Sequence, residues 1–128
     1  MTSSKPISAD PTVTIFHNSA CSTSRQVLEL IRKSGIEPVI VEYLKKPPSR
    51  AALVGLLAAL DIPVRELLRS KEARFAELRL GDTHWSDDEL IGFIAANPIL
   101  MNRPVVVSAL GARLCRPAQQ VLELLPPA

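Results

Sequence analysis

The sequence predicts an α/β protein with a mixed sheet of about four strands, formed by a βαβ unit, a helical insertion and a ββα unit. Short β-branched runs at residues 12–16 and 38–44 flank an amphipathic segment that begins near Cys21. The middle of the chain carries helical patterning between cap signals. Two further apolar runs, joined by a turn at residues 109–111, predict a hairpin before a final helix.

The first unit is predicted from three successive segments. Residues 12–16 read TVTIF, which favours a buried strand. A helix is expected after a short loop, because its spacing places Val27, Leu28 and their apolar neighbours on one face, and Gly35 stands where a helix commonly ends in the left-handed conformation. The run PVIVEYL at residues 38–44 then predicts a second strand, parallel to the first.

The later elements are predicted from caps and turns. Ser49 is expected to cap the helix RAALVGLLAAL, and Pro63 to begin a helical piece that runs to residue 80. Ser86 is followed by Glu89 at capping-box spacing before DDELIGFIAAN. The run PVVVSALGARLC predicts two strands, and Pro117 begins the last helix. This order of elements is that of a thioredoxin-like fold with a helical insertion.

Length and composition limit the class of protein. With 128 residues, 47% of them hydrophobic, the chain is expected to form a single domain over residues 12–128, after a flexible extension at residues 1–11. A net charge of +2 with scattered basic residues argues against nucleic-acid binding, and no apolar run reaches the roughly 18 residues of a membrane span. The extension does not resemble a signal peptide, so a reducing cytoplasm is expected.

Cys21 is the candidate nucleophile. An ordinary thiol, with a pKa of about 8.5, is mostly protonated at neutral pH, so a reactive one needs a lowered pKa. The helix N-terminus, its free N–H groups and Arg25 could each lower it, and the same N–H groups form an anion site. His17 could stabilise the thiolate as imidazolium, or give a proton to a departing oxygen. The alternative for Cys21 is a small buried hydrophobic residue.

Two other kinds of thiol site do not fit the spacing around Cys21. A dithiol oxidoreductase needs a C-x-x-C motif, and Ser24 occupies the second cysteine's place. The interval between Cys21 and Arg25 is shorter than the one in a phosphatase-type anion loop. The residues alone therefore predict a reactive thiol beside an anion, with no neighbouring thiol to resolve it.

The chain resembles the glutaredoxin-coupled arsenate reductases. The stretches that carry this resemblance are HNSACSTSR, YLKKPPSRAALVGLLAALDIPVRELLR and NPILMNRPVVVSALGARLCRP. The resemblance covers about residues 12–125, and one departure from it is Ser19, where the family usually has proline. It implies a thioredoxin-like enzyme that reduces arsenate, uses glutathione as a co-substrate and has glutaredoxin as a partner, with no bound cofactor.

The resemblance also implies roles for individual residues. Cys21 matches the family's nucleophile, and His17 matches the histidine that assists its ionisation. Three arginines match those that hold arsenate and its reduced adduct, and one proline matches the cis proline that faces the cysteine. These residues are Arg69, Arg103, Arg116 and Pro104. Guanidinium groups suit this role because their paired donors match a tetrahedral oxyanion.

Cys115 is expected to be structural, because cysteine is among the most buried residue types. The second thiol must then come from outside the chain, and the resemblance implies that glutathione supplies it. The histidines and cysteines have no spacing that suggests a metal site. Two competing functions remain: a regulator that binds RNA polymerase and switches through a C-x-x-C disulfide, and a thiol oxidoreductase that acts on glutathionylated proteins. Ser24 argues against the first of these.

Overall fold

The computed structural model describes residues 12–126, which form two compact units. Residues 12–42 and 103–126 make up the first unit, and Tyr43–Asn102 make up the second. The second unit corresponds to the helical insertion predicted from the sequence. The single domain over residues 12–128 remains a prediction, and the flexible extension predicted at residues 1–11 lies outside the described residues.

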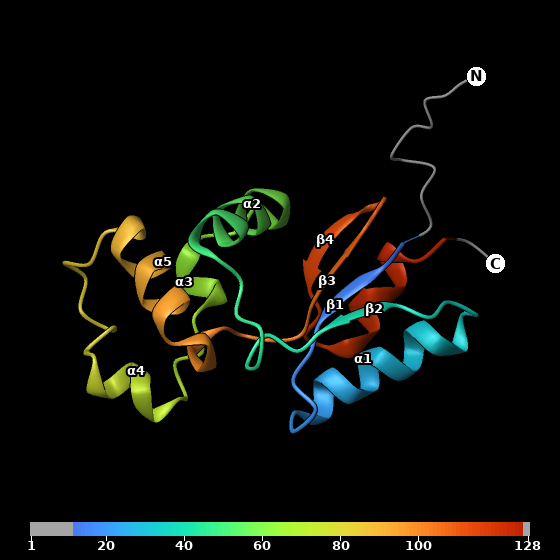
Figure 1. The fold of residues 1–128 in the computed structure, drawn as a ribbon, viewed down its shortest axis with the longest axis horizontal. Helices are drawn as coiled ribbons and strands as arrows, with labels where there is room; N and C mark the ends of the chain where they lie inside the picture. The colour runs from blue at the N-terminus through green and yellow to red at the C-terminus, as the bar shows by residue number, and fades with distance from the viewer. Residues whose placement is uncertain (1–11, 127–128) are drawn as a thin grey trace, which may run out of the picture. The chain divides into compact units, whose positions relative to one another are not determined.

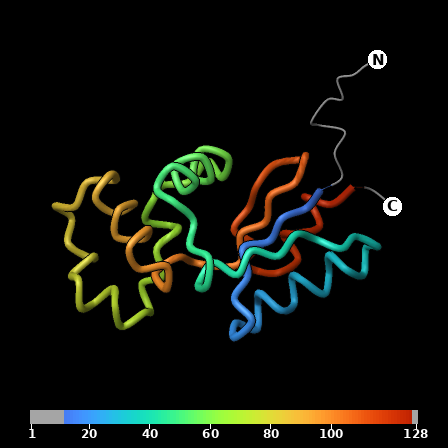
Figure 2. The backbone as a smooth tube through the Cα atoms, viewed as in Figure 1, coloured from blue at the N-terminus to red at the C-terminus, as the bar shows by residue number. Residues whose placement is uncertain are grey.

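The first unit is built on a four-stranded sheet in the order β2-β1-β3-β4 (Figure 1). Strand β1 (Thr14–Phe16) pairs in parallel with β2 (Val39–Val41), and antiparallel with β3 (Val105–Ser108). Strand β4 (Gly111–Leu114) completes the predicted hairpin with β3. The mixed α/β sheet is therefore confirmed. In the backbone trace β1 lies between β2 and β3 (Figure 2). The loop that follows β1 therefore begins inside the sheet rather than at its edge.

Two helical elements cover one face of this sheet. Helix α1 (Ser22–Lys33) and the 3-10 helix η3 (Ala118–Leu124) share a buried apolar cluster with β1 and β3. Ile15 and Val106 are register partners in the sheet, and both are fully buried in this cluster with Ile31. Helix α1 is thus fixed along its length against the sheet, which holds its N-terminus at the end of β1.

The second unit packs short helices around its own core. Helices α2 (Arg50–Leu60) and α3 (Val64–Leu67) both contact α5 (Asp87–Ala96), and α5 in turn contacts the 3-10 helix η2 (Pro98–Leu100). The buried residues that fill this core are mostly leucines on the inner faces of these helices. They include Leu53, Leu57, Leu60, Leu67, Leu90, Ile94 and Leu100.

The helix ends agree with the cap signals of the sequence. Ser49 Oγ accepts a hydrogen bond from Ala52 N at 3.1 Å. Ser86 Oγ accepts from Glu89 N, and the Glu89 carboxylate accepts from Ser86 N, which completes the predicted capping box. Gly35 follows α1 with φ +90°, a conformation that a residue with a Cβ rarely adopts.

The prediction of one continuous helical piece from residue 63 to residue 80 is wrong. It is divided into α3 and α4 (Ala73–Glu77), because Leu68 leaves the helix and forms an antiparallel bridge with Met101. Both side chains are buried, so burying this pair outweighs the local helical preference. Arg69 follows the bridge in a non-helical segment, where its N–H donates to Leu100 O at 2.7 Å.

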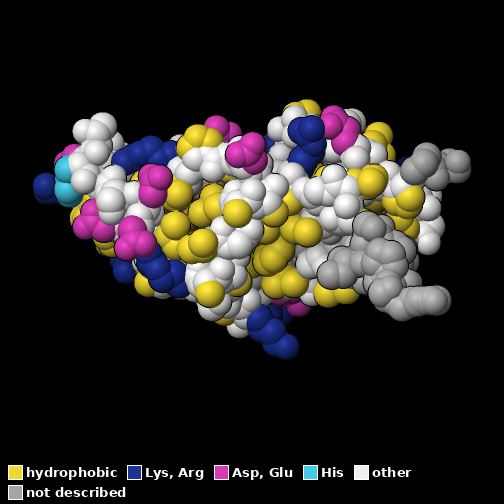
Figure 3. All heavy atoms as spheres, turned by 90° about the horizontal axis from the view of Figure 1, so that it is seen from above, with side chains coloured by type: hydrophobic (Ala, Val, Ile, Leu, Met, Phe, Trp, Pro, Cys, Tyr) yellow, Lys and Arg dark blue, Asp and Glu magenta, His cyan; other side chains and the backbone are white. Residues whose placement is uncertain are grey.

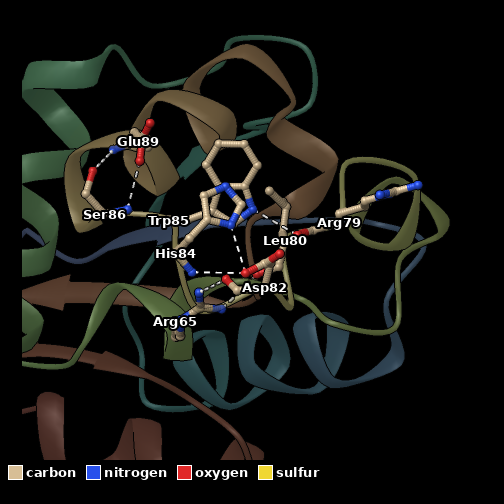
Figure 4. A network of polar contacts seen from close by, with 8 residues as sticks. All are labelled: Arg65, Arg79, Leu80, Asp82, His84, Trp85, Ser86 and Glu89. Atoms are coloured by element: carbon tan, nitrogen blue, oxygen red, sulfur yellow. Dashed lines mark hydrogen bonds and ion pairs between the residues drawn. The ribbon is translucent and has the colours of Figure 1, made fainter.

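Side chains hold the segment that links α4 to α5, although it contains neither a helix nor a strand (Figure 4). The Arg65 guanidinium donates to the carbonyl of Asp82 at 2.8 Å. Trp85 Nε1 donates to the carbonyl of Arg79 at 2.8 Å, and His84 Nδ1 lies 2.8 Å from Asp82 Oδ1. The segment is therefore ordered by bonds from side chains to backbone.

The surface carries charge of both signs. On the face drawn in Figure 3, lysine and arginine side chains lie in separate places among acidic and hydrophobic ones. Among the described residues, no helix combines the length and the apolar character that crossing a bilayer requires.

Candidate active site

Cys21 lies at the junction of loop and helix, as the sequence predicts. Strand β1 ends at Phe16, and Cys21 is the N-cap residue of α1, with extended backbone angles. Its N–H donates to Asn18 O at 3.0 Å, and its carbonyl accepts from Arg25 N at 3.0 Å. The side chain is partly exposed. The sulfur is therefore held at the positive end of a helix and remains accessible.

Two arginines from the C-terminal part of the chain reach this sulfur. Arg116 Nη1 lies 3.9 Å from Cys21 Sγ and also donates to the carbonyl of Arg103 at 2.9 Å. The Arg103 side chain, which is buried, also hydrogen-bonds to the Cys21 thiol. Each of these arginines precedes a cis proline bond, at Pro104 and at Pro117, so the cis bond expected at Pro104 is present.

The surroundings of Cys21 favour the thiolate. Burial alone raises the pKa of the Cys21 thiol. Hydrogen bonds from the Ser24 backbone amide, and then from Arg103 and Arg116, lower it, so that the net pKa lies below the ordinary value. A thiolate and two guanidinium groups thus share one place, and the guanidinium groups are also suitable donors to a tetrahedral oxyanion.

His17 is buried, and its ring faces Ser24. His17 Nδ1 lies 2.6 Å from Ser24 Oγ. Burial, the largest cause, lowers the pKa of His17; Glu42 raises it and Arg32 lowers it again, with a net lowering. The neutral imidazole is therefore the favoured form at neutral pH, which argues against imidazolium as the group that stabilises the thiolate. Its part in catalysis remains a prediction.

Ser24 and Arg25, in the first turn of α1, both contact the loop that precedes the helix. The Ser24 side chain is fully buried against His17, and its backbone N–H is the first of the groups that lower the pKa of Cys21. Arg25 donates through Nη1 to the carbonyl of Ser19 at 2.8 Å. The two arginines that lower the pKa of Cys21 are Arg103 and Arg116, from the C-terminal part of the chain. Arg25 instead holds the loop through its bond to Ser19.

Asn18 is a structural residue of the site that the sequence analysis did not identify. It is buried, and its Oδ1 accepts from Ala20 N at 2.9 Å. Its N–H donates to Ser24 Oγ at 3.1 Å, and its carbonyl accepts from Cys21 N. The available signal was its residue type, because asparagine often closes such turns through its side chain.

Arg69 and Cys115 complete the candidate residues. Arg69 belongs to the second unit, where its Nε lies 3.3 Å from Glu72 Oε2, and its part in the site remains a prediction. Cys115 is fully buried in the apolar cluster of the first unit, and burial raises its pKa to about 12. Both cysteines are free thiols. The burial of Cys115 is what a structural cysteine would show.

The described residues contain no group of three or more His, Cys, Asp or Glu side chains that could hold a metal ion.

Comparisons with known proteins identify relatives of the chain. The model of the ArsC family matches residues 16–124. An arsenate reductase of Rhizobium meliloti (strain 1021) is 56% identical over 115 residues, which cover 90% of this chain and 82% of the relative. An arsenate reductase of Escherichia coli (strain K12) is 53% identical over 116 residues, with 91% and 82% covered. Among solved structures, an arsenate reductase from Vibrio cholerae is similar with a TM-score of 0.85 and 43% identity, and the match covers 89% of this chain and 98% of that one.

Proposed function

We propose that this chain, which belongs to the ArsC family, reduces arsenate to arsenite through a covalent adduct on Cys21. The observation that carries this proposal is the contact of two guanidinium groups, those of Arg103 and Arg116, with one accessible sulfur at a helix N-terminus. Nucleophile and anion donors are thereby combined, which attack on an oxyanion requires.

The chemical steps follow from this arrangement. The Cys21 sulfur bonds to arsenic while one arsenate oxygen takes up protons and leaves as water. These protons come from solvent, because the neutral form favoured for His17 accepts a proton rather than gives one, and Arg103 and Arg116 offset the negative charge of the adduct. We assign Arg69 as the third arsenate ligand and Pro104 as a support behind Cys21, both on the family resemblance.

The second thiol must come from outside the chain. Cys115 is buried and has a pKa of about 12, so it offers little thiolate near neutral pH. A glutathione thiolate would instead attack the Cys21 sulfur; the electron pair of the sulfur–arsenic bond passes to arsenic, and arsenite leaves. Glutaredoxin would then reduce the disulfide between Cys21 and glutathione. Such chemistry suits a reducing cytoplasm, and we expect neither nucleic acid nor a membrane among the partners.

The test is to supply the full chain with arsenate, glutathione and glutaredoxin and to measure arsenite. We expect arsenite only when arsenate and both thiol donors are present. Two other outcomes would contradict the proposal. Recovery of RNA polymerase with the chain, without arsenite formation, would favour a regulator. Reduction of glutathionylated proteins, without arsenite formation, would favour a general thiol oxidoreductase.

Cys115→Ser is expected to leave most arsenate reduction intact, within about threefold of the wild type in kcat, because the Cys115 thiol is buried away from solvent. A modest loss of stability is expected, since a hydroxyl replaces a thiol in the apolar cluster. Rates should therefore be compared at a temperature well below the unfolding transition, with urea unfolding measured in parallel. A loss as large as that of Cys21→Ser would indicate an internal disulfide mechanism.

A further inference from the structure

Ser24 differs from the other polar residues that begin α1. It is fully buried, whereas Ser22 and Arg25 in the same first turn are exposed. A buried hydroxyl near a helix start needs hydrogen-bond partners, because an unpaired one loses its bonds to water without replacing them. Ser24 Oγ has two partners, His17 Nδ1 at 2.6 Å and Asn18 N at 3.1 Å.

The loop that the Ser24 hydroxyl contacts is tied directly to the nucleophile. Asn18, whose N–H donates to Ser24 Oγ, accepts through its carbonyl from Cys21 N at 3.0 Å. The carbonyl of Cys21 in turn accepts from Arg25 N in the first turn of α1. The Ser24 hydroxyl thus links the loop after β1 to the turn that carries the sulfur. The backbone N–H of Ser24 is also the first among the groups that lower the pKa of Cys21.

We propose that Ser24 is a positioning residue, whose hydroxyl bonds to His17 and Asn18 hold the loop after β1 and the first turn of α1 in place around the Cys21 sulfur. The proposal rests on the proposed function only in taking Cys21 as the nucleophile. It gives Ser24 a task beyond occupying the place of a second cysteine. His17 then acts on Cys21 through this hydrogen bond and needs no positive charge to do so.

The hydrogen bonds agree with a neutral His17. Asn18 N–H donates to Ser24 Oγ, which leaves the hydroxyl hydrogen of Ser24 free to donate to His17 Nδ1. When the hydroxyl donates in this way, the neutral ring carries its proton on Nε2. Burial lowers the pKa of His17, so the ring can accept at Nδ1 near neutral pH.

The test is the pH dependence of Cys21 alkylation by iodoacetamide, followed by mass spectrometry so that Cys115 is counted separately. For Ser24→Ala we expect the midpoint for Cys21 to move to higher pH by about one unit, which is a tenfold lower rate below the midpoint. This measurement uses no arsenate. A wild-type chain that alkylates with a low midpoint but forms no arsenite would refute the proposed function and leave the role of Ser24 standing.

The matched control is Ser34→Ala at the opposite end of α1. Ser34 Oγ donates to Ile31 O at 2.6 Å, so this change also removes a hydroxyl bond from the same helix. We expect its alkylation midpoint to equal that of the wild type. An unchanged midpoint in Ser24→Ala, or equal shifts in both variants, would overturn the proposal. Urea unfolding of both proteins separates loss of fold from loss of positioning.

A second variant tests the link to His17. His17→Ala should raise the Cys21 midpoint in the wild-type chain, because Ser24 loses its 2.6 Å partner. In the Ser24→Ala chain, His17→Ala should raise the Cys21 midpoint by much less, since His17 acts on Cys21 through Ser24. Full additivity of the two shifts would show that His17 reaches Cys21 without Ser24, and would overturn the proposed path.

Discussion

Replacing Cys21 with serine is expected to lower kcat for arsenate reduction by roughly a thousandfold or more, because the step that forms the bond to arsenic loses its nucleophile. A serine hydroxyl at this position would have the same donors, the Ser24 amide and Arg116 among them, but it does not ionise near neutral pH. The measurement is arsenite formed per minute with glutathione and glutaredoxin in excess.

The control for this variant is Cys115→Ser, which removes the other free thiol of the chain. Titration of accessible thiols in the native protein should fall from one to nearly none in Cys21→Ser and stay unchanged in Cys115→Ser, since Cys21 is partly exposed and Cys115 is buried. If Cys21→Ser retained a tenth of the wild-type rate, the covalent adduct on Cys21 would have to be abandoned.

Arg116→Ala is expected to reduce kcat/KM for arsenate by about ten- to a hundredfold, because a hydrogen bond to a charged group contributes about 1.5–3 kcal/mol. The same change should raise the pKa of Cys21, since Arg116 is one of the groups that lower it. Arg116 is exposed, so its truncation costs little buried surface, whereas Arg103 is buried and its loss would also disturb packing. Steady-state kinetics and the alkylation profile together measure both effects.

Arg113→Ala is the matched control for Arg116→Ala. Arg113 lies on β4 and forms an ion pair with Glu123 at 2.6 Å, with 46% of its side chain exposed. Such surface pairs contribute about 0–1 kcal/mol, so activity should remain within about twofold of the wild type. Equal losses in the two variants would mean that overall positive charge, rather than the contact of Arg116 with Cys21, supports the reaction.

Much of the fold could be predicted from the sequence because the relevant signals are local. The hairpin and the caps at Ser49 and Ser86 depend on residues within a few positions of one another. The parallel pair β1 and β2 joins residues further apart, but each strand has its own local apolar run and one helix connects them. The division of the segment from Pro63 onward could not be predicted in this way, since the bridge from Leu68 reaches a residue more than 30 positions later. The last helix starts at the predicted place but is a 3-10 helix.

The sequence by itself determined that Cys21 begins a helix, that Ser24 denies it a neighbouring thiol, and that the chain resembles one family of reductases. Only the tertiary structure decided which groups surround the sulfur. Arg116 lies 95 residues away along the chain, and it reaches Cys21 because β3 pairs with β1 and β4 with β3, which brings the end of the hairpin back to the site. The burial of Cys115 and the inward turn of the Ser24 hydroxyl were decided in the same way, by packing between segments that local patterns do not connect.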